Sequence, residues 1–160
     1  MSEGPAGGHD SRPEDPAFSQ DAPDSTPVHG ADTHQLYRRG LDLLGRGSPA
    51  AAAQLLERAA AAEPRSRSVL EALARAQFDA GQYAAAAGNF RRIVDASPSD
   101  DYAQFGLGLA LARTGDPGAA AEHLALAAAM RPNLRHYTDA LRSVRATLRA
   151  RNDLKKGFED

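Results

Sequence analysis

The chain has no cysteine and no tryptophan, and aromatic residues make up only 6% of its 160 residues. Without cysteine there is no disulfide framework, no thiol nucleophile and no thiolate metal site. No apolar run approaches the roughly 18 residues that a membrane-spanning helix needs. The first ten residues lack the basic region and apolar core of a secretory signal. These absences favour a cytoplasmic protein, and the few bulky side chains favour a core of closely packed helices.

Charge is divided unevenly along the chain. Residues 1–32 hold seven acidic residues against Arg12 alone, whereas residues 33–160 hold 18 basic and 14 acidic residues. The first stretch is rich in proline and poor in aliphatic residues, so it cannot bury enough surface to offset a chain entropy of about 1–2 kcal/mol per residue. We therefore expect residues 1–31 to be a disordered acidic tail. We expect this tail to serve solubility, or a binding role such as folding back on the basic C-terminus.

Glycine and proline recur with one fixed period. The same interval separates Gly47 from Gly81 and Gly81 from Gly115, and half of that interval leads from each glycine to a proline, namely Pro64, Pro98 and Pro132. A period of this size, about 34 residues, marks a stack of helical units that cannot bury their apolar faces alone. In each unit glycine supplies the positive φ that ends the first helix, and proline stops the second.

This punctuation predicts three antiparallel helix pairs and one further helix. The spacing of Asp32 and Gln35, and of Ser68 and Glu71, predicts a capping box at the start of the first and third helices. The expected helices are 32–46, 49–63, 68–80, 83–96, 101–114, 117–130 and 135–151. Residues 152–160 are expected to form a frayed C-terminus.

Small and large residues alternate in register inside the period. Units aligned at Thr33, Arg67 and Asp101 have small residues at the eighth and twentieth positions and large apolar residues at the twenty-fourth. The eighth positions are Gly40, Ala74 and Gly108, the twentieth are Ala52, Ala86 and Ala120, and the twenty-fourth are Leu56, Phe90 and Leu124. Small residues admit a neighbouring helix and large ones fill the space beside it.

The pattern resembles the tetratricopeptide repeat, a helix–turn–helix unit of the same period with small residues at these positions and proline at the thirty-second. The resemblance covers repeats 33–66, 67–100 and 101–134, and residues 135–151 match the extra helix that covers the last pair in such arrays. It implies an all-α fold, a right-handed α-solenoid of three hairpins with a C-terminal solvating helix, over residues 32–151. The aromatics that the family has at the fourth and eleventh positions are absent.

In that family the first helices line a concave groove that holds a peptide or helix of a partner protein. Exposed aromatic residues in such a groove are favourable anchors, because each buries a large area at low rotamer cost. Carried over by position, the candidate peptide-binding groove residues are His34, Tyr37, Leu41, Glu71, Arg75, Tyr102, Phe105 and Arg113. Leu44, Phe78 and Leu109 hold groove positions too, but we expect them to pack against neighbouring helices.

The resemblance therefore implies a non-catalytic adaptor for protein–protein interactions. Two alternatives are a nucleic-acid-associated protein that uses Arg142, Arg145 and Arg149, and a module that forms homo-oligomers. A solvated capping face explains the same arginines more simply.

Clamping of acidic chaperone tails, a well-known use of such repeats, is not predicted. The five positions that provide the clamp in those proteins hold Tyr37, Leu41, Ala72, Tyr102 and Gly106 here. None of these residues supplies the positively charged or amide donors that the clamp uses for a carboxylate.

No catalytic residue, metal site or cofactor is predicted. His34 and His136 hold equivalent second positions, but two imidazoles without a carboxylate or thiolate make a poor metal site. The Gly106-Leu107-Gly108 segment lies inside an expected helix with no strand before it, so it is not a phosphate-binding loop.

Overall fold

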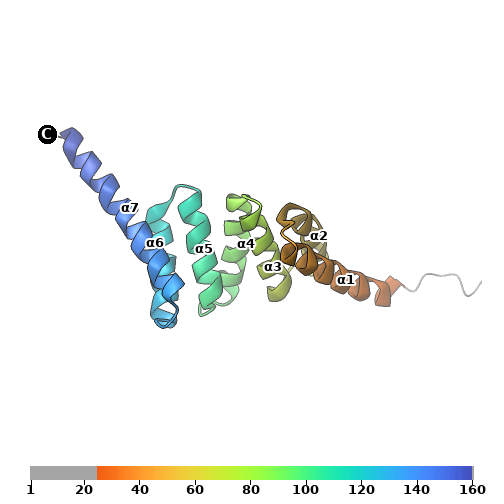
Figure 1. Ribbon diagram of the computed structural model, residues 1–160. Helices are drawn as coiled ribbons and strands as arrows, with labels where there is room; N and C mark the ends of the chain where they lie inside the picture. Colours follow the sequence, from red (N-terminus) through yellow and green to blue (C-terminus); the bar gives the residue numbers. More distant parts are fainter. Residues whose placement is uncertain (1–24, 160) are drawn as a thin grey trace, which may run out of the picture.

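The computed structural model describes residues 25–159 and is entirely helical over that range, apart from the short turns (Figure 1). The helices are α1 (Ser25–Gly45), α2 (Pro49–Ala62), α3 (Arg67–Asp79), α4 (Tyr83–Ala96), α5 (Asp101–Arg113), α6 (Pro117–Met130) and α7 (Arg135–Glu159). The all-α prediction is confirmed: three helix–turn–helix hairpins are stacked side by side, and α7 follows them.

The turns inside the hairpins form where the glycine period predicts them. Gly47, Gly81 and Gly115 have φ of +77°, +80° and +90°, the left-handed region in which a side chain would be strained. After each glycine the next N–H returns to a carbonyl near the end of the first helix, as from Ser48 to Leu43 at 2.9 Å. This bond satisfies a carbonyl that has no partner within the helix, so glycine both ends that helix and reverses the chain.

The helix starts are capped differently from the prediction. Ser66, not Ser68, caps α3, and its hydroxyl accepts a bond from the Val69 N–H at 3.4 Å. Glu71 instead forms an ion pair with Arg67 at 2.7 Å. The capping box predicted at Asp32 is also wrong, because Asp32 lies inside α1.

Two predicted boundaries need correction at the ends of the chain. The predicted disordered tail covers 1–31, but α1 already begins at Ser25; residues 1–24 lie outside the described residues. Pro27 does not prevent this, because it falls in the first turn, where an N–H has no intrahelical partner. The predicted frayed segment 152–160 is helical to Glu159, since good helix formers such as Leu154 and Lys155 continue α7.

The helices form two layers. Each helix packs on the next in sequence, and α1 contacts α3, α3 contacts α5 and α5 contacts α7. Within the described residues there is no comparable contact between α2, α4 and α6. The first helices are therefore closer together than the second helices, so the stack curves with α1, α3, α5 and α7 on its concave side.

Glycine lets the two helices of a hairpin approach closely. A Cβ built on Gly40 would lie 2.5 Å from Cγ of Leu56, and one on Gly108 would lie 2.6 Å from Cγ of Leu124. Both leucines are completely buried. The eighth and twenty-fourth positions thus fit together as a small residue against a large one.

In the second hairpin a different pair of residues makes the close contact. Its twenty-fourth position is Phe90, and a Cβ on Gly106, the sixth residue of the next repeat, would lie 2.5 Å from the Phe90 ring. The same two positions are held by Leu56 and Ala72 one repeat earlier, and by Leu124 and Ala140 one repeat later. The larger Phe90 is thus matched by the smaller Gly106, which conserves volume at the junction between hairpins.

Polar bonds join the starts of successive first helices. Asp100 caps α5 by accepting from the Ala103 N–H and also accepts from Arg67 Nε at 2.6 Å, which ties α3 to α5. Partial burial opposes the negative charge of Asp100, but the bonds from Arg67 and Ala103 outweigh it and lower its pKa. One step further along, the Tyr137 hydroxyl donates to Asp101 at 2.8 Å and ties α7 to α5. Burial and this bond raise the pKa of Tyr137.

We predict that Gly106→Ala lowers the free energy of unfolding by about 1–3 kcal/mol, because its methyl group overlaps the Phe90 ring. In a Phe90→Leu background the same change should restore stability, since the double variant reproduces the Leu56–Ala72 pairing. Gly88→Ala is the control: Gly88 lies exposed in α4 with nothing within 4 Å of an added Cβ. Gly88→Ala should raise the free energy of unfolding by about 0.5–1 kcal/mol. Chemical denaturation measures the free energy of unfolding of Gly106→Ala, Phe90→Leu, their double variant and Gly88→Ala. An equal gain in stability from Gly106→Ala and Gly88→Ala would contradict this packing.

We predict that Arg67→Ala costs about 0.5–1 kcal/mol near neutral pH, because the Arg67 side chain is partly exposed and its ion pairs are screened. Asp100 has a folded-state pKa below its ordinary 3.8. Its stabilisation is therefore complete above that value and is lost as the pH falls through the lowered pKa. Denaturation of the natural protein and of Arg67→Ala at several pH values should show that their difference in free energy of unfolding shrinks only in strong acid. A difference that already vanishes at mildly acidic pH would be inconsistent with this pairing.

Candidate functional site

A hollow of about 250 Å³ lies on the concave layer between α3 and α5. From α3 it is lined by Arg75, Phe78 and Asp79, from α5 by Tyr102, Phe105, Gly106 and Leu109, and from α4 by the buried Phe90. We call this hollow the α3–α5 hollow. It combines aromatic walls with one cation and one carboxylate.

Tyr102 stands at the centre of this arrangement. Its ring meets Phe90 edge to face, with centroids 6.2 Å apart. Burial raises the pKa of its hydroxyl, the charge of Arg75 opposes that shift, and Glu71 and Asp79 reinforce it. The hydroxyl is therefore neutral at physiological pH and can donate one hydrogen bond. Arg75 is exposed and makes no hydrogen bond or ion pair with any other residue of the described chain, so its donors are available.

Phe105 forms the side of the α3–α5 hollow nearest to α7. Its ring stacks on Tyr137 with centroids 4.5 Å apart and meets His136 edge to face at 5.3 Å. Because Tyr137 is also bonded to Asp101, the α7 helix holds Phe105 in place.

The other predicted groove residues lie elsewhere. His34 and Tyr37 line a separate hollow of about 210 Å³ beside the loop between α2 and α3. Leu41 packs against the core, and Glu71 is engaged with Arg67.

Arg113 does not line the α3–α5 hollow and is held instead by residues on both sides of the preceding hairpin turn. Its guanidinium lies 5.8 Å from the centre of the Phe78 ring and 5.3 Å from the centre of the Tyr83 ring. Its Nη1 also donates to the Tyr83 hydroxyl oxygen at 3.1 Å. The structure thus brings together Arg75, Tyr102 and Phe105 and leaves the remaining candidates apart.

Some lining residues were not among the candidates. Phe78 and Leu109, which we expected only to pack, also line the α3–α5 hollow, whereas Leu44 packs against the core. Phe90 holds no groove position of the repeat, and Gly106 holds a clamp position but was not among the groove candidates. The sequence signal for them was the pairing of a large twenty-fourth residue with a glycine at the sixth position of the next repeat.

The arginines of α7 lie where a further hairpin partner would pack. Arg142 stands at the eighth position, which is Gly40, Ala74 or Gly108 in the repeats. With Thr138, Leu141, Arg145 and Arg149 it lines an open hollow of about 300 Å³. A bulky charged group at this position does not allow the close helix approach that occurs at Gly40 and Gly108.

The described residues offer no group of three or more histidine, aspartate or glutamate side chains that could hold a metal ion. None of the helices in that part of the chain is both long and apolar enough to cross a membrane.

Solved structures with this fold include several repeat domains. The first such domain of Spaghetti (RPAP3), bound to an HSP90 peptide, has 19% identity and a TM-score of 0.68, with 74% of this chain and 94% of that chain covered. The Sgt2 domain from Aspergillus fumigatus has 21% identity and a TM-score of 0.69, with 76% and 82% covered. The C-terminal domain of a Plasmodium falciparum FK506-binding protein has 15% identity and a TM-score of 0.72, with 78% and 93% covered. At these identities the likeness concerns the fold alone.

Among curated proteins, no sequence matches this chain. The family model described as "Tetratricopeptide repeat" matches residues 37–101 and 71–134, which together make up more than half of the chain. The chain belongs to the tetratricopeptide repeat family.

Proposed function

We propose that this protein is a non-catalytic adaptor, cytoplasmic as its sequence led us to expect, which holds a peptide or helix of a partner protein in the α3–α5 hollow. The observation that carries the proposal is the convergence of Arg75, Tyr102 and Phe105 around one hollow of about 250 Å³ on the concave layer.

The chemistry of the α3–α5 hollow suits one apolar side chain and one polar group of a ligand. Tyr102 and Phe105 offer large apolar faces at little entropic cost, since each has only two rotatable bonds. Arg75 offers charge-assisted donors to a carboxylate or carbonyl beside that side chain. Asp79 lies in the same hollow and disfavours a ligand that carries several negative charges.

The ligand proposed here therefore differs from the peptide in the Spaghetti (RPAP3) complex. That HSP90 peptide is named as SRMEEVD and contains two adjacent glutamates. The clamp positions here are Tyr37, Leu41, Ala72, Tyr102 and Gly106, none of which carries a positive charge. We therefore propose a ligand with an apolar anchor and at most one acidic group.

The hydrogen bonds between α5 and α6 have a structural role rather than a catalytic one. His123 of α6 has its Nδ1 2.7 Å from Gln104 Oε1 of α5, and Gln104 Nε2 donates to the Pro98 carbonyl. Because the Gln104 oxygen is an acceptor, His123 Nδ1 is its donor. This arrangement positions side chains between α5 and α6 and presents no nucleophile to a base.

We predict that peptides selected from a random display library with the full chain bind about tenfold or more weakly to an Arg75→Ala/Tyr102→Ala variant, because central aromatic and arginine anchors dominate such interfaces. Isothermal titration calorimetry measures the dissociation constants, and circular dichroism checks the fold. Arg91→Ala is the matched control, since Arg91 is exposed on α4 and lies outside the α3–α5 hollow. Unchanged affinity in the double variant, or an equal loss in the control, would argue against this site.

A further inference from the structure

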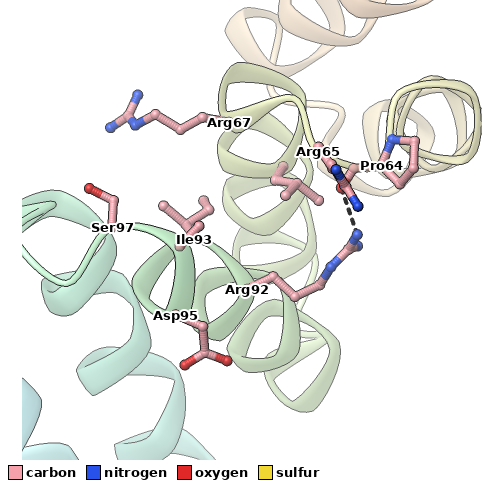
Figure 2. Close-up of a pocket in the computed structure, with 9 residues that line it drawn as sticks. Pro64, Arg65, Arg67, Arg92, Ile93, Asp95 and Ser97 are labelled. Carbon is pink, nitrogen blue, oxygen red and sulfur yellow. Dashed lines mark hydrogen bonds between the residues drawn. The ribbon is translucent and has the colours of Figure 1, made fainter.

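A second and larger hollow lies apart from the α3–α5 hollow. It has a volume of about 560 Å³ and is formed by the start of α3, the end of α4 and the loop before α3 (Figure 2). Its lining residues are Pro64, Arg65, Arg67, Leu70, Arg92, Ile93, Asp95, Ala96 and Ser97. We call it the α3–α4 hollow. It shares no residue with the α3–α5 hollow, so a ligand here does not occupy the proposed peptide site.

Within residues 25–159, two of its three arginines have no acidic partner. Arg67 is engaged by Glu71 and Asp100, whereas Arg65 makes no hydrogen bond or ion pair with a residue from the described part of the chain. Arg92 donates Nη2 to the Pro64 carbonyl at 2.6 Å and keeps its other guanidinium donors. Figure 2 shows the Asp95 carboxylate directed away from Arg65 and Arg92.

The floor between these arginines is apolar. Leu70 and Ile93 are buried core residues that reach this surface, and Ala96 and Pro64 lie beside them. An apolar floor framed by guanidinium groups fits a ligand that has one apolar or aromatic side chain flanked by carboxylates. A small inorganic anion would leave the floor uncovered.

The chain itself contains a segment with this chemistry. Phe18 is the one aromatic residue in residues 1–24, and acidic residues stand on both sides of it, at Glu14 and Asp15 and at Asp21 and Asp24. Residues 1–24 as a whole have six acidic residues against Arg12. Charge complementarity therefore favours this segment as the occupant.

The α1 helix packs against α2 and α3, and the loop that connects α2 to α3 borders the α3–α4 hollow. Thr33 of α1 borders a hollow together with Glu63 and Ser66, and Pro64 and Arg65 belong to the same loop. From Thr33 back to Ser25, α1 rises about 12 Å. The stretch from Ser25 back to Phe18 can span about 23–25 Å when extended. This length exceeds the sum of the rise along α1 and one distance between neighbouring helices, which is about 8–10 Å.

We propose that residues 14–24 dock in the α3–α4 hollow of their own chain, with Phe18 on Leu70 and Ile93 and the flanking carboxylates paired with Arg65 and Arg92. The acidic segment is then a built-in ligand for the edge of the second hairpin. Other acidic segments with an aromatic residue compete with it for the same place. This inference is independent of the proposed peptide site.

Phe18→Trp tests the docking in the full chain, because the natural sequence has no tryptophan and the new indole is the single reporter. At low salt we expect the indole emission of Phe18→Trp to lie at shorter wavelength, and its quenching by acrylamide to be weaker, than for Ala6→Trp. Ala6 lies in residues 1–24 but outside the proposed docking segment 14–24. Adding Arg65→Ala/Arg92→Ala to Phe18→Trp should lower the ratio of docked to free segment by about tenfold or more, since hydrogen bonds to charged groups are lost. Adding Arg91→Ala should change nothing, because Arg91 does not line the α3–α4 hollow.

Other results would overturn the proposal. Equal emission and quenching for Phe18→Trp and Ala6→Trp at low salt would mean that the segment stays free. A burial signal that grows with protein concentration would mean that a second copy provides the segment. A signal that persists in Arg65→Ala/Arg92→Ala, with unchanged circular dichroism, would place Phe18 on another surface. Raised salt should weaken the expected signal, because partly exposed ion pairs are screened.

Discussion

The close approach of two helix backbones at a glycine is the constraint on which the rest of the structure depends. At Gly40 and Gly108 even one methyl group would overlap the buried leucine of the partner helix. This contact sets how tightly each of these hairpins closes. On one side of the stack α1 contacts α3, α3 contacts α5 and α5 contacts α7, and these four helices form the concave layer. The position of Tyr102 on α5 therefore depends on Gly108, a residue that does not line the α3–α5 hollow.

The parts of the fold that depend on the period could be predicted from the sequence. The turn glycines all have positive φ, and the predicted bounds of α2 to α6 agree with the structure to within one residue. The two ends could not be predicted in this way, because no second copy of the pattern exists there. Pro27 is compatible with a helix only because it falls in a first turn, and α7 continues past Asn152 on local helix propensity alone. Leu154 and Phe158 on that extension remain largely exposed, at 64% and 90%.

The sequence could predict which surface carries the candidate site, but not which residues form it. Repeat positions identify which side chains lie on the concave layer, but not which of them converge. Arg113 occupies such a position and is nevertheless held by the Phe78 and Tyr83 rings, whereas Arg75 is left available beside Tyr102. The difference arises because Tyr83, at the start of α4, lies within reach of α5 and supplies both a ring and a hydroxyl. A contact of this kind depends on side-chain geometry that a positional rule does not contain.

The α7 helix links the end of the array to the shape of the α3–α5 hollow. Arg142 of this helix stands at the eighth repeat position, where Gly40 and Gly108 admit a partner helix, and it lines an open hollow instead. The inner face of α7 carries Tyr137, which stacks on Phe105 and donates to Asp101. Phe105 is therefore fixed from the side of α7, although only α5 and α3 would meet a ligand there. A helix that serves to cover the last hairpin thus also sets the rigidity of one wall of the hollow, because a ring stacked on a second, hydrogen-bonded ring has few alternative rotamers.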